Sequence, residues 1–331
     1  MEFLIEYGLF LAKTITIVVA VLAAVGGTIA LTSRGRPKAK ERLEVRNLNR
    51  TYESMARTLQ TAILPRRQVK KILKLGKKHD KAKQKQHAGA APSRKVFVLN
   101  FHGDIRASAV VSLRKEITAI LMIATPKDEV VLRLESGGGL VHAYGLAASQ
   151  LLRIKEKKIA LTVAVDKIAA SGGYMMACVA DRLIAAPFAV IGSIGVVSQL
   201  PNFHRLLKKN GIDFEQFTAG EYKRTITLFG ENTDKARDKL RQEIEDTHLL
   251  FKDFVKAQRS HLDIAKVATG EYWFGVRALE LKLVDELRTS DDYLMQASEE
   301  AAELFEVSYA SRKKLATRLL SFAMQMLQRH Y

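Results

Sequence analysis

The hydrophobic and polar positions after residue 95 follow two different periods. Apolar or alternating runs of period two predict strands, and apolar positions recurring every three or four residues predict helices. The predicted strands cover residues 95–101, 129–136, 158–165 and 182–197, with a further strand over 212–219. The predicted helices cover residues 106–124, 141–155 and 233–259, and another begins at Ser171. Strands that alternate with helices favour an α/β fold with a parallel sheet and right-handed crossovers.

A different pattern occupies the N-terminus, where residues 14–32 carry no charge. A helix of this length spans about 28 Å, close to the thickness of a bilayer core. A cleaved signal peptide would have its basic residues in front, but here most follow the run, at Arg34, Arg36, Lys38, Lys40 and Arg42. We therefore expect residues 1–33 to form a transmembrane anchor, with the rest of the chain on the cytoplasmic side by the positive-inside rule.

Residues 34–94 combine an amphipathic segment with a strongly basic one. Apolar positions at spacings of three and four predict a helix over residues 43–64, which Pro65 ends. Residues 66–95 then contain twelve lysines and arginines against one acid, Asp80, a net charge of +11. A run of this kind is typical of a solvated linker, and anionic lipid is a natural partner. No aromatic residue interleaves with these lysines, which argues against nucleic acid.

The remaining chain divides into a globular domain over residues 95–300 and a C-terminal segment over 301–331. The apolar residues of 311–329 share one helical face flanked by basic residues, so we expect this segment to dock on a subunit or on a membrane. The single cysteine, Cys178, excludes a disulfide within the chain and a zinc site built on cysteines. We expect it to be a buried apolar residue.

The stretch Ser171-Gly172-Gly173 is unusual for the start of a helix. Serine is a good N-cap, but two glycines directly after it weaken a helix. A serine placed there, at the carboxyl end of a buried strand, points into the crevice where open α/β sheets bind ligands. The N–H of Gly172 would lie where an oxyanion develops, and the triple glycine 137–139 after a neighbouring strand could supply a second donor.

A nucleophilic serine needs a base, and the sequence offers two kinds. Among the eight histidines, His142 is the only reasonable member of a Ser-His-Asp triad, although it also fits as a plain residue at a helix start. The alternative is a lysine kept uncharged by burial, for which Lys223 in one of the less charged parts of the chain is the candidate. The residues alone leave both open.

Four blocks, LESGGGLVHAYGLAASQL, VDKIAASGGYMMACVAD, APFAVIGSIGVV and TAGEYKRTITLFGEN, resemble the membrane-bound serine proteases of the signal peptide peptidase A family. The resemblance covers nearly the whole chain. It implies a ClpP/crotonase-like fold with an N-terminal transmembrane helix, and a Ser–Lys dyad with no cofactor and no metal. It assigns Ser171 as nucleophile, Lys223 as general base, Ser193 as the residue that holds the lysine, and Gly138 with Gly172 as the oxyanion hole. One position departs: Gly137 stands where the family usually has proline.

The resemblance implies a membrane-anchored serine endopeptidase of the bacterial inner membrane that cleaves peptides such as signal peptide remnants or misfolded proteins. It also implies a homo-oligomeric ring whose substrate grooves are built from adjacent subunits. Descriptions of some relatives favour a periplasmic catalytic domain, against the charge rule. Two other functions stay open: a crotonase-type acyl-CoA enzyme and a non-catalytic membrane scaffold. Labelling of Ser171 by a serine-directed probe separates the first from a protease, and comparing a Ser171→Ala strain with a deletion strain separates the second.

Overall fold

The computed structural model describes residues 5–20, 42–65, 68–69, 94–300 and 302–310. The chain divides into two units, one made of Met1–Arg42 with Ala310–Tyr331 and the other of Leu43–Tyr309. In the first unit residues 5–20 form a helix. Most of the expected anchor over 14–32, and all of the expected helix over 311–329, lies outside the described residues. Within the described part of the chain, no helix has both the length and the apolar character that a membrane span requires.

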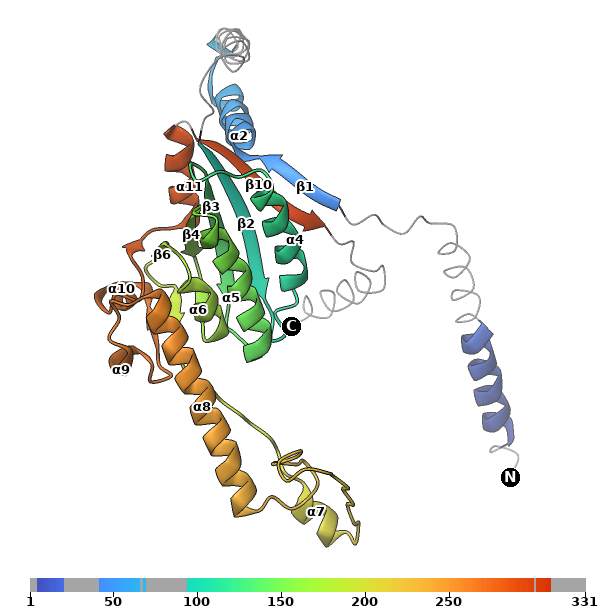
Figure 1. Ribbon diagram of the computed structural model, residues 1–331. Helices are drawn as coiled ribbons and strands as arrows, with labels where there is room; N and C mark the ends of the chain where they lie inside the picture. Colours follow the sequence, from blue (N-terminus) through green and yellow to red (C-terminus); the bar gives the residue numbers. More distant parts are fainter. Residues whose placement is uncertain (1–4, 21–41, 66–67, 70–93, 301, 311–331) are drawn as a thin grey trace. The chain divides into compact units, whose positions relative to one another are not determined.

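The second unit is built on a mostly parallel sheet (Figure 1). Its main path runs in the order β1-β10-β2-β3-β4-β6-β9. The strands on this path are β1 (Arg42–Asn47), β10 (Glu303–Ala310), β2 (Lys95–Gly103), β3 (Glu129–Ser136), β4 (Ala160–Val165), β6 (Arg182–Ala185) and β9 (Glu286–Leu287). Every registered pair from β10 to β9 is parallel. The predicted α/β class with a parallel sheet is therefore confirmed.

Three short strands branch from the end of β3 and form the frame of the candidate site. β5 (Ile168–Ala170) pairs with β3 through Ser136 and Ala169, and β7 (Val190–Gly192) pairs with β5 in parallel. β8 (Tyr272–Phe274) closes the branch by pairing antiparallel with β7. The segments that follow β3, β5 and β7 are thereby brought to the same edge, because parallel strands end on the same side of a sheet.

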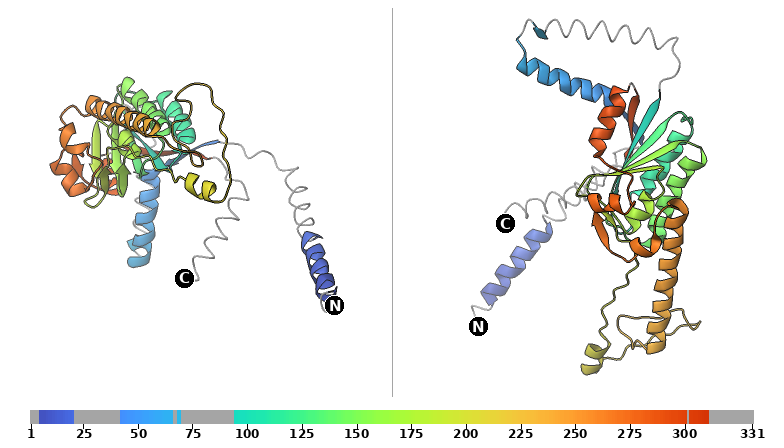
Figure 2. Two further views of the ribbon diagram at one scale, coloured as in Figure 1. Left: turned by 90° about the horizontal axis from the view of Figure 1, so that it is seen from below. Right: turned by 90° about the vertical axis from the view of Figure 1, so that its left-hand side faces the viewer.

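Helices cover both faces of the sheet (Figure 2). The core on one face joins alternate residues of β2, β3 and β4 to α4 (Val110–Leu121), α5 (Val141–Glu156), α6 (Gly172–Ala177) and the end of α8 (Asp234–Gln258). The intervening strand residues pack on the other face against α11 (Ser290–Glu299) and the first residue of α2 (Leu48–Ile63). The remaining helices are α7 (His204–Lys209), α9 (Ile264–Val267) and α10 (Gly275–Glu280). Burial on both faces explains why the predicted strand over 158–165 is an almost continuous apolar run.

Three segments differ from the sequence prediction. The helix predicted over 43–64 begins only at Leu48, because residues 42–47 add the strand β1 to the edge of the sheet beside β10. The C-terminal segment that we expect to be helical starts with a strand, β10, over residues 303–310. The strand predicted over 212–219 does not form. Each difference follows from pairing, since a strand is stable only where a partner strand is available.

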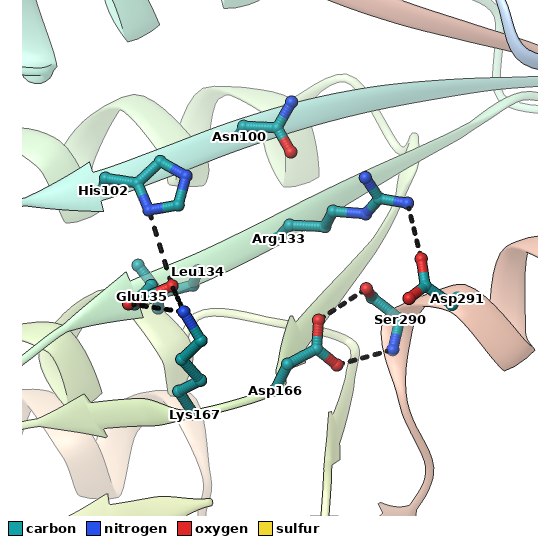
Figure 3. Close-up of a pocket in the computed structure, with 9 residues that line it drawn as sticks. All are labelled: Asn100, His102, Arg133, Leu134, Glu135, Asp166, Lys167, Ser290 and Asp291. Carbon is teal, nitrogen blue, oxygen red and sulfur yellow. Dashed lines mark hydrogen bonds and ion pairs between the residues drawn. The ribbon is translucent and has the colours of Figure 1, made fainter.

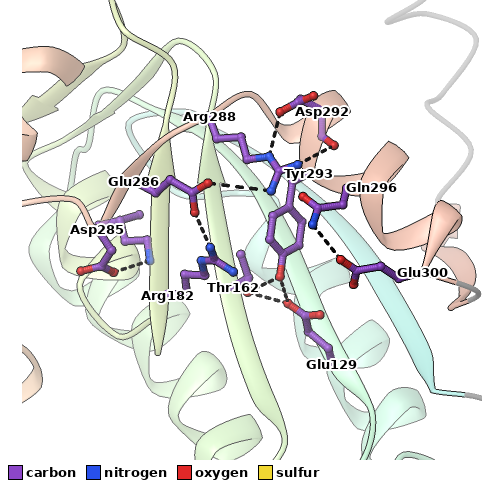
Figure 4. Close-up of polar contacts among 11 residues, drawn as sticks. Glu129, Thr162, Arg182, Asp285, Glu286, Arg288, Asp292, Tyr293, Gln296 and Glu300 are labelled. Carbon is purple, nitrogen blue, oxygen red and sulfur yellow. Dashed lines mark hydrogen bonds and ion pairs between the residues drawn. The ribbon is translucent and has the colours of Figure 1, made fainter.

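A buried carboxylate, that of Glu129, links two central strands to α11 (Figure 4). One of its oxygens accepts hydrogen bonds from Thr162 Oγ1 and Tyr293 OH, both at 2.6 Å. The other pairs with the guanidinium of Arg94. Burial raises the pKa of the Tyr293 phenol, and the neighbouring Glu129 adds to this effect. A satisfied network of this kind fixes the position of α11 on the sheet.

A second ion pair, between the buried Arg259 and the more exposed Asp285, fixes the C-terminal end of α8. The guanidinium of Arg259 is 3% exposed and donates to Asp285 Oδ1 at 2.5 Å and to the Lys282 carbonyl at 3.1 Å. Asp285 also accepts from the Leu183 N–H at 2.7 Å. Burial alone would raise the pKa of the Asp285 carboxyl, but the bonds from Arg259 and Leu183 outweigh it and hold this pKa below its usual value.

An Asp285→Asn variant should be less stable than the wild type at pH 7 by about 2 kcal/mol, the range for charged hydrogen bonds. Because folding lowers the pKa of Asp285, its stabilising effect is complete above the unfolded pKa of about 3.9 and disappears as the pH falls through the folded pKa. The urea midpoints of the two chains should therefore converge below about pH 4. Glu280→Gln, which breaks an exposed pair with Arg277, is the control and should shift nothing. Equal stability of Asp285→Asn and wild type at pH 7 would contradict this role.

Candidate active site

Ser171 occupies a strained turn between β5 and α6. Its φ of 52° and ψ of −120° lie outside the regions that non-glycine residues normally adopt. Strain of this kind costs about 1–3 kcal/mol and persists only where the surroundings impose it. Here the Ser171 N–H donates to the Gly192 carbonyl at 2.8 Å, and the Ser171 carbonyl accepts from the Met175 N–H at 3.0 Å. The N–H and the carbonyl of Ser171 are thus both hydrogen-bonded, while its side chain stays partly exposed.

The two glycines after Ser171 are explained by close packing. A Cβ at Gly172 would lie 2.5 Å from Tyr144 Cγ, and a Cβ at Gly173 would lie 2.4 Å from the Ser136 carbonyl oxygen. Any side chain at either position would therefore collide with α5 or with the end of β3. The two glycines lower the helix propensity of the first turn of α6, but their lack of side chains lets Ser171 lie close to the sheet.

The backbone of Gly138 lies directly against the Ser171 turn. Its φ is +90°, and a Cβ on it would come within 2.6 Å of the Gly172 nitrogen and 2.8 Å of Ser171 Cβ. The structure thus brings Gly138, Ser171 and Gly172 together, as the oxyanion-hole prediction requires. In this conformation the Gly138 N–H donates to Ser136 Oγ at 3.1 Å. A Cβ on Gly137 would touch only Ile168 Cδ1 at 3.8 Å, so the loop has space for a Cβ at this position.

Hydrogen bonds through Ser136 connect the glycine loop, residues 137–139, to α5. Ser136 Oγ lies 2.5 Å from Tyr144 OH, and Tyr144 OH donates to the Asp104 carbonyl at 2.7 Å. Because Tyr144 donates to Asp104, the Ser136 hydroxyl is left to donate to Tyr144 and to accept from the loop N–H. Burial raises the pKa of the Tyr144 phenol, which keeps this donor protonated. The loop position is therefore fixed by buried groups of three separate segments.

Ser193 is a second non-glycine residue with positive φ, at 50°. It follows β7, and its N–H donates to the Glu271 carbonyl at 2.6 Å. The preceding residue, Gly192, is the one whose carbonyl accepts from Ser171. Ser171 and Ser193 therefore leave neighbouring paired strands at the same level, which places the Ser193 backbone beside the Ser171 turn. Its role in holding the lysine stays a prediction.

A small, mostly apolar pocket adjoins Ser171. Its lining comes from the glycine loop, α5, α6, the segment after β7 and α8: Gly139, Val141, Ser171, Gly172, Met175, Gly195, Val196, Thr247 and Phe251. Sequence reasoning missed the contribution of Thr247 and Phe251, although the apolar face of the helix over 233–259 indicates that Phe251 packs against the core. His142 is exposed and does not line this pocket. Among the described contacts, none joins His142 to Ser171, so the triad has no support.

Lys223 lies away from the pocket of Ser171. Its neighbours Glu221 and Tyr222 contact Lys235 (2.6 Å) and Lys239 (Nζ 5.3 Å from the ring centroid), near the N-terminus of α8. The Ser171 pocket touches α8 at Thr247 and Phe251 instead. With a rise of 1.5 Å per residue, the positions 239 and 247 are separated by about 12 Å. Within one chain the structure does not bring Lys223 to Ser171, and its role as base stays a prediction.

Residues 198–233, which carry Lys223, form an arm at the far end of α8 (Figure 1). The arm packs mainly on itself, with the ring of Phe229 lying 6.1 Å from that of Phe203 and 5.8 Å from that of Phe214. Large apolar side chains on it remain exposed, among them Leu206, Ile212 and Phe217. Lys223 is exposed as well.

A larger pocket of about 230 Å³ lies away from Ser171, where β2, β3 and β4 end beside α11 (Figure 3). Its charged groups bind one another. Lys167 Nζ pairs with Glu135 at 3.2 Å, and the Asp166 carboxylate accepts from both the N–H and the hydroxyl of Ser290. These interactions hold the carboxylates of Glu135 and Asp166 in place, and we place the chemistry at Ser171 because of its strained turn.

The described residues contain no group of histidine, cysteine and carboxylate side chains suited to a metal ion. Cys178 is fully buried, as predicted, and burial raises the pKa of its thiol to about 12. A thiol of this kind is unreactive at neutral pH.

A Gly138→Ala variant should lose most of the reactivity of Ser171. The new Cβ would meet backbone atoms of the Ser171 turn at 2.6–2.8 Å in a conformation that alanine rarely adopts. We expect labelling of Ser171 by a fluorophosphonate probe to slow roughly a hundredfold, as when an oxyanion-hole donor is lost. Gly137→Ala, in the same loop but with space for a Cβ, should label at the wild-type rate. Equal labelling of the two variants would contradict the proposed geometry.

Comparisons with known proteins show which proteases the chain resembles. The sequence matches the family models "Peptidase family S49 N-terminal" over residues 2–151 and "Peptidase family S49" over residues 153–304. It is 50% identical over 323 residues to the "Probable protease SohB" of Haemophilus influenzae, covering 95% of this chain and 91% of that protein. The "Probable protease SohB" of Buchnera aphidicola subsp. Schlechtendalia chinensis is 48% identical over 304 residues, covering 89% and 99%.

A more distant relative is the "Putative protease MJ0651" of Methanocaldococcus jannaschii, 35% identical over 170 residues, or 50% of this chain and 53% of that protein. The resemblance predicted from the four sequence blocks is thus confirmed, and the mostly parallel sheet is consistent with a ClpP-like protease fold. The chain belongs to peptidase family S49.

Proposed function

We propose that the protein is a serine endopeptidase in which Ser171 is the nucleophile. The observation that supports this most is the clamped turn at Ser171, with Gly138 against one side and Gly192 bonded to the other. Strain at a partly exposed serine, beside a pocket and at the carboxyl ends of parallel strands, is the arrangement expected of a reactive residue. Membership of a peptidase family supplies the reaction class.

The reaction follows from these groups. An uncharged amine of Lys223 takes the proton of Ser171, whose oxygen attacks the carbonyl carbon of a peptide bond. The N–H groups of Gly172 and Gly138 stabilise the oxyanion, after the Gly138 N–H leaves Ser136 Oγ. The lysine then gives its proton to the leaving amine. Water hydrolyses the acyl-enzyme with the lysine as base again, which restores both side chains, and Ser193 holds the lysine in position.

We infer that Lys223 reaches Ser171 from a neighbouring copy of the chain. The arm carrying Lys223 lies along the N-terminal part of α8, whereas the pocket of Ser171 lies beside its C-terminal part. Exposed apolar residues on the arm, such as Leu206 and Phe217, supply a surface for docking on a neighbour. Repetition of one head-to-tail contact closes a ring, so every copy would give its serine to one site and its lysine to the next.

The substrate class follows from the pocket and the N-terminus. The apolar side chains of Val141, Met175, Val196 and Phe251 border Ser171 and favour apolar substrate residues next to the cleaved bond. The uncharged run over 14–32 would anchor the enzyme in the bacterial inner membrane, near membrane-associated peptides such as signal peptide remnants. The basic residues after this run favour a cytoplasmic catalytic domain, with the periplasmic side as the alternative. A reporter fused after residue 40 distinguishes the two.

Mixing two inactive variants tests the shared site. Ser171→Ala and Lys223→Ala should each abolish cleavage of an apolar peptide. When the two chains are dissociated and reassembled in equal amounts, a site forms wherever an intact Ser171 meets an intact Lys223 of the neighbour. Random assembly into rings predicts recovery of about a quarter of the wild-type activity. Arg224→Ala, beside Lys223, is the matched control and should retain activity alone.

No recovery on mixing, with rings that form normally, would overturn the shared site. Normal activity of Lys223→Ala alone would overturn the assignment of the base. Normal activity of Ser171→Ala would overturn the proposed function as a whole.

A further inference from the structure

α2 extends beyond the core (Figure 2). Several apolar side chains of this helix are exposed to solvent. Its first residue, Leu48, is buried among the residues of the sheet and α11. On the same face, the side chains of Met55, Leu59 and Ile63 are 60%, 63% and 76% exposed. Spacings of seven, four and four residues align Leu48, Met55, Leu59 and Ile63 along one side of the helix as an apolar stripe.

The base of α2 is held rigidly, so the stripe has a defined direction. Asn49 Nδ2 donates to Ser298 Oγ at 2.9 Å and to the Ala302 carbonyl at 3.0 Å. Its Oδ1 accepts from the Leu304 N–H at 2.8 Å. One side chain therefore connects the first turn of α2 to α11 and β10. The rest of this 16-residue helix, which is about 24 Å long, extends from that fixed point.

The exposed part of α2 needs a partner. Isolated helices of this length are marginal in water, and most helix stability in proteins comes from burial of the apolar face. The opposite face carries Glu53, Arg57 and Thr61 and suits solvent. An apolar stripe opposite a polar face with few acids is the pattern of helices that lie at a membrane surface.

Charge favours lipid over a second copy of the helix. The sequence on both sides of α2 is cationic, with a net charge of +4 over residues 34–47 and +11 over residues 66–95. Two copies packed through their stripes would bring these like charges together, whereas anionic headgroups attract them. The exposed stripe from Met55 to Ile63 also covers little more than one heptad, fewer than a stable coiled coil requires.

We propose that α2 lies in the plane of an anionic membrane surface, with Met55, Leu59 and Ile63 inserted at the headgroup boundary. The proposal rests on the proposed function only through the anchor over 14–32. From residue 33 to residue 47 the chain can span at most about 50 Å, which keeps α2 near the bilayer. Contact through α2 would also fix the orientation of the catalytic domain, because Asn49 joins α2 to the sheet.

Single-cysteine labelling of the full chain tests this contact. Leu59→Cys lies on the stripe, and Thr61→Cys lies two residues away on the polar face as the matched control. The natural Cys178 is fully buried and should not react with a polarity-sensitive fluorophore. Each labelled chain, in a Ser171→Ala background, is reconstituted into vesicles of phosphatidylcholine with phosphatidylglycerol. We expect lipids bearing a quencher to reduce the signal at position 59 at least about threefold more than at position 61.

Phosphatidylcholine alone should weaken this difference, because the anionic attraction is lost. Equal quenching at the two positions would overturn the proposal. So would a label at position 59 that is shielded in lipid-free detergent and insensitive to the quencher, since a second copy would then cover the stripe. Flotation of both chains with the vesicles reports the anchor separately, and neither readout depends on peptidase activity.

Discussion

The backbone turn at Ser171 is the constraint on which the rest of the site depends. Its N–H is bonded to Gly192 in the neighbouring strand, and the Gly138 backbone presses against its other side. Neither contact allows the serine to relax to a normal φ. The same closeness requires glycine at 172 and 173, because Tyr144 and the end of β3 occupy the space of any side chain. The chain thus stabilises one strained turn with contacts from three segments, namely β7, α5, and the end of β3 with its glycine loop.

Helix α8 lies between the Ser171 turn and the arm that carries Lys223, and this matters for the proposed assembly. Its C-terminal end is fixed to the core by the pair of the buried Arg259 and Asp285, and about two turns earlier Phe251 lines the pocket of Ser171. Its N-terminal end carries the arm with Lys223 away from that pocket. A rigid helix between nucleophile and base would leave a single copy inactive and make activity depend on assembly. For a peptidase, such dependence would protect other proteins from cleavage by unassembled chains.

Helices and strands that depend on local apolar periodicity can be predicted from the sequence, whereas features that depend on contacts with distant residues are predicted poorly. The strand over 129–136 and the helix over 141–155 follow directly from apolar periodicity, and Ser171 is found at a helix start by its context. The need for Gly172 could not be read from the sequence, because it comes from Tyr144, a residue of another helix. Likewise β1 forms because β10 offers an edge, whereas residues 212–219 find none. The roles of Lys223 and Ser193 came from the family resemblance and still await a direct test.

Cross-linking between chains measures most directly whether nucleophile and base come from different copies. Ser171→Cys and Lys223→Cys chains carrying different tags are co-assembled and treated with a short bismaleimide, while the buried Cys178 stays unreacted. A shared site predicts a covalent dimer that contains both tags, with the linker joining positions 171 and 223. The result that would contradict it is a linker that joins these positions only within a chain carrying both cysteines, with no dimer from the mixed singles.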